Sequence, residues 1–170
     1  MTTDPDPDRA TLEAALAGRG DYELFPCDPA LADTAAFCAA YGFAPEDSAN
    51  TIIVVGKGAE PVYAACVVLA THRLDVNRAV KARFGRKSSF ASPDETRAIT
   101  GHEIGGVTVF VLPADLPVWI DAAVMERGRI VLGGGSRSWK VIAPASILLT
   151  LPAAEVVEGL ANLAPPRPEA

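Results

Sequence analysis

The sequence has few of the residues that build metal centres, disulfide frameworks and surfaces that coat nucleic acids. Its 170 residues include three cysteines, two histidines and only 6% aromatic residues. No apolar run approaches the roughly 20 residues that a membrane-spanning helix requires. Acidic residues outnumber basic ones by 21 to 15, which gives a formal net charge of −6. These shortages argue against a membrane protein, a disulfide-stapled miniprotein and a protein that coats DNA.

The cysteines and histidines are also poorly placed for a shared metal ion. Cys27, Cys38 and Cys66 match no zinc-binding spacing, and only His72 and His102 could join them. We therefore expect three free thiols in a reducing cytoplasm, and neither a metal nor another cofactor. The acidic first residues lack the basic and apolar regions of a signal peptide, which agrees with a cytoplasmic location.

Apolar residues are abundant and make up 49% of the sequence. That fraction and the chain length suit one domain around one core. Alternating Asp and Pro residues at the start predict a disordered lead-in over residues 1–8. The Pro-rich end predicts a flexible tail over residues 163–170, which leaves a single domain over residues 9–162.

Apolar periodicity and capping residues predict helices and strands in alternation along this domain. Helices are expected over residues 8–17, 29–41, 76–84, from 93 onward, 144–149 and 153–160. Strands are expected over residues 22–25, 51–55, 62–69, 88–90, 107–112, 118–120, 129–132 and 139–142. The segments 51–55 and 62–69 are expected to pair as a hairpin. This interleaving predicts a mixed α/β or α+β fold.

Charge is distributed unevenly along the chain, and one short segment is basic. Residues 1–47 hold ten acidic and two basic residues, whereas residues 72–87 hold six basic residues and one acidic residue. This basic segment, residues 72–87, has two interpretations. It is either a solvated helix face or a patch that contacts nucleic-acid phosphates, because clustered Lys and Arg bind polyanions whatever the global charge.

Common signatures of nucleotide and hydrolase sites are absent from the sequence. Gly56-Lys57 lacks the frame of a phosphate-binding loop, and Gly134-Gly135-Ser136-Arg137-Ser138 lacks the last glycine of a nucleophile elbow. The second half instead carries polar and glycine-rich positions near predicted strand ends. They are Thr100, Gly101, Gly105, Gly106, Thr108, Asp121 and residues 133–135. Glycine admits close approach of a ligand and exposes amides to an oxyanion, but turn geometry produces the same pattern.

Several short motifs occur in order between residues 20 and 160. They are Tyr22-Glu23-Leu24, Ser48-Ala49-Asn50-Thr51-Ile52, residues 64–69, Leu74-Asp75, Arg86-Lys87, Ala91-Ser92-Pro93-Asp94-Glu95, Thr100-Gly101-His102, Gly105-Gly106-Val107, Ile120-Asp121 and residues 133–135. Together they resemble the YbaK/EbsC family, whose members are free-standing relatives of the editing domain inserted in bacterial prolyl-tRNA synthetase. The resemblance implies a mixed, curved, barrel-like β-sheet with flanking helices.

The resemblance also implies an activity, which is hydrolysis in trans of the ester that links a wrong amino acid to its tRNA. The catalytic residues that it implies are Gly105, Gly106, Thr108 and Asp121. The substrate-binding residues that it implies are Asn50, Thr100, Gly101, His102, Gly134 and Gly135. Phosphates of the tRNA are expected to contact Arg73, Arg78 and Lys81. The implied partners are the 3′ end of an aminoacyl-tRNA and an aminoacyl-tRNA synthetase, with no DNA and no membrane.

Two positions differ from the usual pattern of this family and leave other functions open. Asn50 stands where the family usually has a lysine, and Val109 stands where members commonly have a proline. If turnover is lost with that lysine, the chain is a non-catalytic protein that binds an aminoacyl end or a small ligand in the same fold. Hydrolysis of another small acyl or nucleotide ester is a third alternative.

Overall fold

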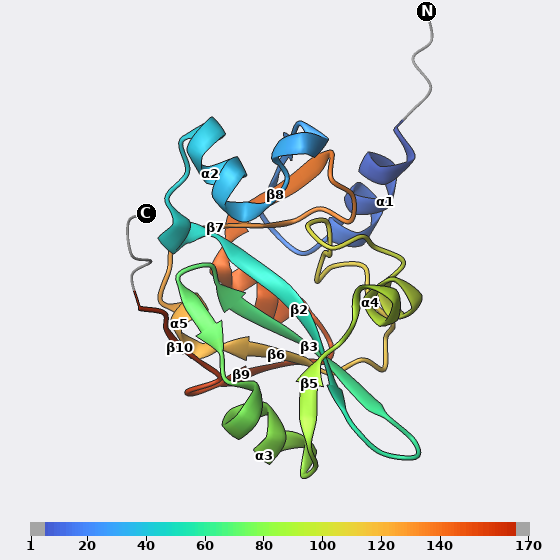
Figure 1. Ribbon diagram of the computed structural model, residues 1–170. Coiled ribbons are helices and arrows are strands. Elements are labelled where there is room, and N and C mark those ends of the chain that lie inside the picture. The colour runs from blue at the N-terminus through green and yellow to red at the C-terminus, as the bar shows by residue number, and fades with distance from the viewer. Residues whose placement is uncertain (1–5, 166–170) are drawn as a thin grey trace, which may run out of the picture.

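The computed structural model describes residues 6–165, in which the helices are short. The α-helices are α1 (Pro7–Leu16), α2 (Thr34–Tyr41), α3 (Lys81–Phe84), α4 (Pro93–Thr100) and α5 (Ala122–Met125). Short 3₁₀-helices are η1 (Pro29–Leu31), η2 (Pro45–Asp47) and η4 (Ala145–Thr150). A π-helical turn, η3 (Val76–Val80), leads directly into α3. The helices lie around the strands, as Figure 1 shows.

The strands form three sheets. They are β1 (Glu23–Pro26), β2 (Ala49–Gly56), β3 (Val62–Leu69), β4 (His72–Leu74), β5 (Ser88–Phe90), β6 (Val118–Asp121), β7 (Arg129–Gly133), β8 (Trp139–Pro144), β9 (Ala154–Val157) and β10 (Ala161–Leu163). The largest sheet has the order β5-β2-β3-β6-β9, in which β3-β6 and β6-β9 are parallel and the other pairs are antiparallel. A second sheet has the order β1-β8-β7, and β10 pairs with β4. The expected mixed α/β fold is therefore confirmed.

Apolar side chains cover both faces of the largest sheet, which explains the nearly continuous apolar character of β2 and β3. On one face, Ile53 and Val67 join a core that also contains residues of α1, β7 and β8. On the other face, Val54 and Cys66 pack with Trp119 and residues of η3. The first half of β2 also lies against β7, where Ser48 and Val131 form an isolated bridge. This contact brings the two larger sheets together.

The chain between β1 and β2 contains an interruption that matters for the site. A single helix is expected over residues 29–41, but η1 ends at Leu31 and α2 begins at Thr34. Asp28 caps η1 by accepting a hydrogen bond from the Ala30 amide at 2.9 Å. The break between the two helices leaves the carbonyl of Ala32 available to a side chain from elsewhere in the fold.

Two further predicted elements are wrong. Residues 107–112 form turns rather than a strand, since the Thr108 hydroxyl accepts a hydrogen bond from the Phe110 amide and closes the backbone locally. Residues 154–157 form β9 rather than part of a helix, because they pair in parallel with β6. Pairing with a neighbouring strand here outweighs the local preference for helix.

Hydrogen bonds of the described chain reach into both terminal segments of the sequence prediction. Asp6, inside the expected lead-in, caps α1 through the Asp8 amide and accepts a hydrogen bond from Trp139 Nε1 at 2.8 Å. In the expected tail, Leu163 ends β10, and the Ala164 amide donates to the Thr71 carbonyl at 2.9 Å. The remaining residues of the two predictions, 1–5 and 166–170, lie outside the described residues.

The cysteines are free thiols, as expected, and all three are buried. Burial raises the pKa of Cys27 and Cys38, and it raises the pKa of Cys66 to about 12. Such thiols stay protonated and behave as small apolar groups. Within residues 6–165, no helix combines the length and apolar character needed to cross a membrane.

Candidate functional site

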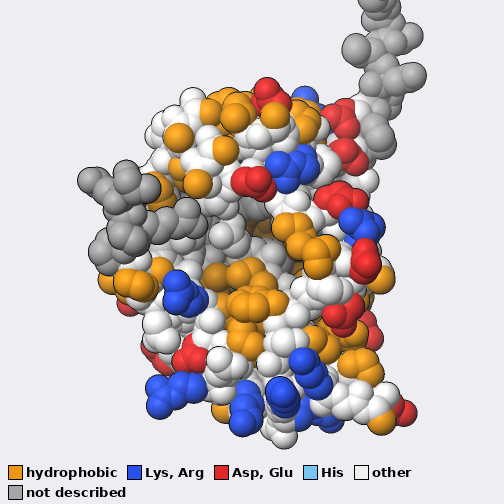
Figure 2. Space-filling view, viewed as in Figure 1, with side chains coloured by type: hydrophobic (Ala, Val, Ile, Leu, Met, Phe, Trp, Pro, Cys, Tyr) orange, Lys and Arg blue, Asp and Glu red, His pale blue; other side chains and the backbone are white. Residues whose placement is uncertain are grey.

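A cavity of about 350 Å³ opens between the start of α2, the first half of β2 and the β7-β8 pair. The glycine loop, defined here as residues 101–107, contributes Ile104, Gly105 and Val107 to its wall. Figure 2 shows the hollow near the centre of this face, with apolar side chains along its lower rim. The ionisable side chains that line it, among the described residues, are Asp33 and Lys140.

Lys140 reaches the cavity from β8, and only 7% of its surface is exposed. Its Nζ donates hydrogen bonds to the carbonyl of Ala32 at 2.7 Å and to the carbonyl of Gly105 at 3.3 Å. The ammonium also lies 5.5 Å from the centre of the Phe37 ring. Burial lowers the pKa of Lys140, because the charged form loses hydration. Lys140 thus links the break before α2 to the glycine loop.

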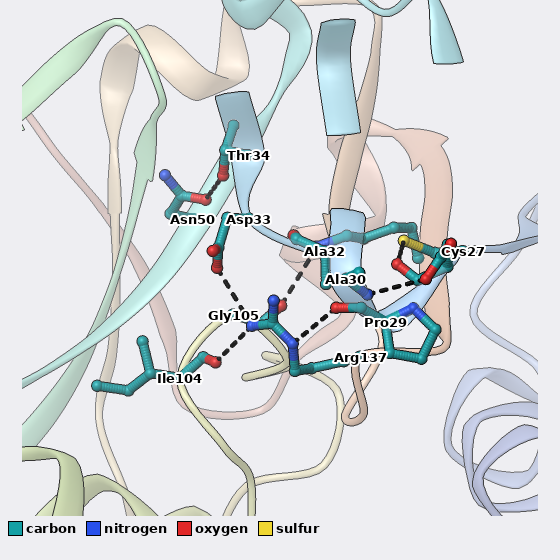
Figure 3. Close-up of polar contacts among 12 residues, drawn as sticks. Cys27, Pro29, Ala30, Ala32, Asp33, Thr34, Asn50, Ile104, Gly105 and Arg137 are labelled. Carbon is teal, nitrogen blue, oxygen red and sulfur yellow. Dashed lines mark hydrogen bonds and ion pairs between the residues drawn. The ribbon is translucent and has the colours of Figure 1, made fainter. Parts of the chain in front are cut away.

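Arg137, in the turn between β7 and β8, links the same two segments by a second route (Figure 3). Its Nε donates to the carbonyl of Pro29 at 2.9 Å. One Nη donates to the carboxylate of Asp33 and to the carbonyl of Ile104, both at 3.2 Å. The carboxylate that lines the cavity is therefore already paired with a guanidinium group.

Gly105 lies at the third position of a tight turn whose ends are joined by the Gly106 amide and the Glu103 carbonyl at 2.9 Å. Its φ of 89° lies in the left-handed region, which a residue with a Cβ rarely adopts. The carbonyl of Gly105 accepts from Lys140, whereas its amide donates no hydrogen bond to any of the described residues. The turn therefore leaves one backbone donor uncommitted beside the cavity.

Asn50 and Thr51 supply polar groups from β2. The Oδ1 of Asn50 accepts a hydrogen bond from the Thr34 hydroxyl at 2.8 Å, which orients the side-chain amide (Figure 3). The Nδ2 of Asn50 donates to none of the described residues, and both Asn50 and Thr51 line the cavity. The hydroxyl of Thr51 is buried and has no partner among the described residues. A buried polar group without a partner is costly unless a ligand or water satisfies it.

Of the residues that the sequence suggested for the site, the structure places Asn50 and Gly105 on the cavity wall. Gly106 follows in the same loop, but its amide and carbonyl are both used in backbone hydrogen bonds, with Glu103 and Gly135. Thr108 is fully buried next to the loop and does not line the cavity. Its hydroxyl accepts from the Phe110 amide at 3.4 Å, so it supports the turn beyond the loop.

The three consecutive glycines of residues 133–135 allow two backbone segments to approach closely. A Cβ on Gly133 would overlap the carbonyl oxygen of Val107, and a Cβ on Gly134 would overlap the carbonyl oxygen of Trp139. Gly133 lines the cavity, whereas Gly134 and Gly135 do not. Gly133 is therefore explained by close packing against the glycine loop, and Gly134 by close packing against the start of β8.

Asp121 does not share the cavity with Asn50, contrary to expectation. It ends β6, while Asn50 lies on β2, and β3 runs between these strands in the sheet. Only 2% of Asp121 is exposed, and its Oδ1 accepts from the Ala161 amide at 3.2 Å. Its other oxygen is buried without a partner among the described residues. The strand-end aspartate therefore holds the start of β10 rather than facing the cavity.

Thr100, Gly101 and His102 also lie outside the cavity lining. The Thr100 hydroxyl donates to the Thr96 carbonyl at 2.7 Å and accepts from the His102 amide at 3.0 Å. Gly101 closes α4 in the left-handed conformation, with φ of 75°. His102 is partly buried, and its Nδ1 has no partner among the described residues. Burial lowers the pKa of His102, while Asp8 opposes that shift.

The basic segment forms part of the surface below the cavity. Arg73, Arg78 and Lys81 are exposed, and Figure 2 shows Lys and Arg side chains gathered at the bottom of the molecule, over α3 in Figure 1. Arg83 instead pairs with Glu155. Phe90, which is 54% exposed, lines both the cavity and a second hollow that Arg73 lines. The basic segment and the cavity are therefore neighbours through Phe90.

Sequence reasoning missed Lys140, Thr51 and the Thr34 partner of Asn50. A signal for Lys140 was present, because it is the single charged residue in the strand Trp139-Lys140-Val141-Ile142. Charged residues are rarely buried within strands unless they have partners or a function. Thr34 and Thr51 carried no comparable signal, since only the folded chain brings them to one wall.

Comparison with known protein families assigns the chain to one of them. The model of the family described as "Aminoacyl-tRNA editing domain" matches residues 28–145. The chain belongs to this family. The editing-domain match begins at the cap of η1 and ends at the end of β8, so it contains every side chain that lines the cavity. The resemblance that the sequence motifs indicated is thereby confirmed.

Individual relatives of this editing domain are distant or partly covered. The uncharacterized protein YwhH of Bacillus subtilis is 37% identical over 62 residues, which are 36% of this chain and 40% of that protein. The chain thus matches less than half of this relative's length. Among solved structures, the hypothetical protein APE2540 gives a TM-score of 0.79 at 22% identity, covering 89% of this chain and 99% of that one.

A second solved structure bears on the fold in the same way. It is described as a candidate trans-editing enzyme for prolyl tRNA synthetase, and it gives a TM-score of 0.77 at 23% identity. The alignment covers 91% of this chain and 98% of that chain. At these identities the similarity establishes that the folds are the same.

Proposed function

We propose that the protein is an aminoacyl-tRNA deacylase that acts in trans, hydrolysing the ester of a mischarged tRNA. The observation that carries the proposal is the set of uncommitted donors on one cavity wall of an editing domain. These donors are the Gly105 amide and the Nδ2 group of Asn50, with the Lys140 ammonium beside them. A cavity of about 350 Å³ has room for a terminal nucleoside or an aminoacyl group.

The chemistry required of such a site is modest. An aminoacyl ester is already activated, so orienting it beside a water molecule removes much of the barrier. When water attacks the ester carbonyl, the carbonyl oxygen becomes negative, and a preorganised donor such as the Gly105 amide stabilises that charge. The bond to the ribose oxygen then breaks, and that oxygen takes up the proton that the water loses. The buried lysine and the Arg137 contacts to Ile104 and Asp33 hold this loop in place. In this proposal the chain contributes positioning and charge stabilisation.

The surface next to the cavity suits the 3′ end of a tRNA. The exposed cations Arg73, Arg78 and Lys81 would contact phosphates, and Phe90 offers a ring on which a base can stack. Phe90 lies between the second hollow and the cavity, since it lines both. An acceptor end that follows this path would deliver its aminoacyl group to the wall formed by Asn50 and Gly105.

A second candidate is a non-catalytic protein that binds an aminoacyl end. The lining favours it in one respect, because the described residues around the cavity include no histidine, and their one carboxylate, Asp33, is paired with Arg137. A site without a free general base binds its ligand but hydrolyses it only if the substrate's own groups assist. The two candidates differ in turnover rather than in binding.

The deciding experiment measures release of the amino acid from a panel of mischarged tRNAs incubated with the purified protein. A deacylase releases at least one amino acid faster than the rate without protein. Binding of a tRNA without release on any member of the panel would support the non-catalytic candidate instead.

Two glycine variants provide a matched pair for the release assay. Gly105→Ala places a Cβ at positive φ and against Arg137, so we expect at least a 10-fold loss of activity. Gly128→Ala adds the same atom where nothing lies within 4 Å, and we expect no change. Equal activities of the two variants would contradict a role for the glycine loop.

A further inference from the structure

Within residues 6–165, Lys140 is a buried cation without a carboxylate partner, since no ion pair there includes it. The residue is only 7% exposed, and its Nζ has two backbone carbonyls as hydrogen-bond partners. Asp33, the carboxylate that lines the same cavity, is paired with Arg137. A buried charge without an opposite charge is costly, and proteins usually keep such a group only where it has a task.

The hydrogen bonds of Lys140 leave part of its capacity unused. An ammonium group has three donors, and the carbonyls of Ala32 and Gly105 accept two of them. The side chain also lines the cavity, so the remaining donor can reach a ligand there. Ala32 and Gly105 belong to separate segments, and their two bonds hold the Nζ at one place on the wall.

The groups around Lys140 do not neutralise it. Cys27 and Cys38 are close enough to affect its pKa, but burial raises the pKa of both thiols, so they remain uncharged at neutral pH. Arg137 is a further cation nearby and disfavours the charged form of Lys140, whereas Asp33 favours it. The cavity therefore presents a net excess of positive charge on the side formed by Lys140.

We infer that Lys140 is the residue through which the cavity binds a negatively charged oxygen group of its ligand. Resting on the proposed function, the inference allows two sources for that group. One is the side-chain carboxylate of an acidic aminoacyl group, and the other is the phosphodiester next to the terminal adenosine of the tRNA. Both present oxygen atoms that accept a charge-assisted hydrogen bond from an ammonium group.

Binding of stable analogues tests the inference without any turnover. The probes are adenosines whose 3′ position carries an aminoacyl group through an amide bond. One pair compares an aspartyl with an asparaginyl group, and the other compares an alanyl probe with and without a 5′-linked cytidine phosphodiester. We expect calorimetry to show about 10-fold or tighter binding of the anionic member of one pair, which identifies the source. Equal binding within both pairs would overturn the inference.

Two variants assign the preference to Lys140. Lys140→Met keeps a similar length without the charge. Both probes lose the hold that Lys140 has on the glycine loop, but the preferred anionic probe should lose about 10-fold more affinity than its neutral counterpart. Lys140→Arg keeps the charge and should retain part of the preference. Thermal melting shows whether the Lys140→Met protein is folded. If it is folded and its affinity for both probes falls equally, Lys140 is a structural residue and the inference is refuted.

The outcome is separable from that of the proposed function. If wild-type protein prefers an anionic probe but releases no amino acid from any mischarged tRNA, the deacylase proposal fails and the inference on Lys140 stands. If the protein releases an amino acid from a mischarged tRNA but prefers no anionic probe, the deacylase proposal stands and the inference on Lys140 fails. If Lys140→Met does not fold, wild type and Lys140→Arg still test the inference. Wild type must prefer the anionic probe, and this preference must be smaller in Lys140→Arg.

Discussion

Lys140 and Asp121 are both buried ionisable residues at strand positions, but their surroundings differ in kind. Lys140 lines a cavity and retains an unused donor after bonding the carbonyls of Ala32 and Gly105. Asp121 lies away from that cavity and accepts a hydrogen bond from the Ala161 amide, with its second oxygen enclosed. The Lys140 ammonium lies beside the cavity, whereas the Asp121 carboxylate lies against the backbone of β10. The difference teaches that burial of charge alone does not mark a functional site.

The comparison also explains why Asp121 was the easier residue to select from the sequence. An acidic residue after an apolar strand is typical of a pocket, and it is equally typical of a residue that caps the following segment. Asp121 has neither role here, since its side chain makes no capping hydrogen bond to α5 and instead accepts one from the Ala161 amide at the start of β10. Only the direction of the side chain separates the two roles.

The largest effect is expected from Asp121→Ala. The Ala161 amide would lose its acceptor in a buried position, which lowers the free energy of unfolding by about 1–3 kcal/mol. Activity and ligand binding per folded molecule should not change, because Asp121 does not line the cavity. Chemical denaturation and the release assay measure the two quantities. Asp121→Asn keeps an oxygen for the amide and should lose less stability, while a loss of binding in folded Asp121→Ala would break the comparison.

An intermediate effect is expected from exposed cations, which are a third kind of charged group. Arg78→Glu combined with Lys81→Glu should lower affinity for tRNA about 10-fold at low salt, since phosphate contacts release counterions. The difference from wild type should shrink as salt is raised, and the stability of the fold should hardly change because both side chains are exposed. Filter binding at several salt concentrations gives the slope. Unchanged affinity at low salt would show that the basic segment is only a solvated face.

The smallest effect is expected from His102, which is partly buried and forms no ion pair with any of the described residues. Burial lowers the pKa of His102 in the folded protein below its ordinary value near 6.5. The unfolded chain therefore binds a proton first as the pH falls, so this residue lowers stability below about pH 6.5 and has no such effect above it. We therefore compare how far the melting temperature of each protein falls between pH 7.5 and pH 5. The fall should be smaller for His102→Gln than for wild type.

Thermal melts of wild type and His102→Gln at both pH values check this sign. Nearby Asp8 favours the protonated form and limits the size of the effect. A variant that loses more stability than wild type between pH 7.5 and pH 5 would show that His102 gains rather than loses from protonation in the fold. That result would indicate an anionic partner beside His102, whereas Lys140 has no carboxylate partner among the described residues.

Local features of the fold were predictable from the sequence. The β2-β3 hairpin, the start of α4 at Ser92-Pro93 and the ends of α2 and α3 at glycine all follow from neighbours in the chain. The expectation failed at residues 153–160, where pairing with the distant strand β6 prevailed, and at residues 107–112, where a local turn replaces the strand. Apolar runs show that a segment is buried, but they do not show which partner buries it.

The sequence by itself determined the family, the mixed α/β class, the free thiols and two positions of the cavity wall, Asn50 and Gly105. The class and the thiols follow from residue type and spacing, whereas Asn50 and Gly105 follow from the resemblance of short motifs to a known family. The tertiary structure alone decided that Lys140 belongs to the cavity and that Asp121 does not. These placements depend on how β8 lies against the break before α2 and on how β10 returns to the end of β6. Such contacts join residues about 108 and 40 positions apart, and local side-chain chemistry carries no record of them.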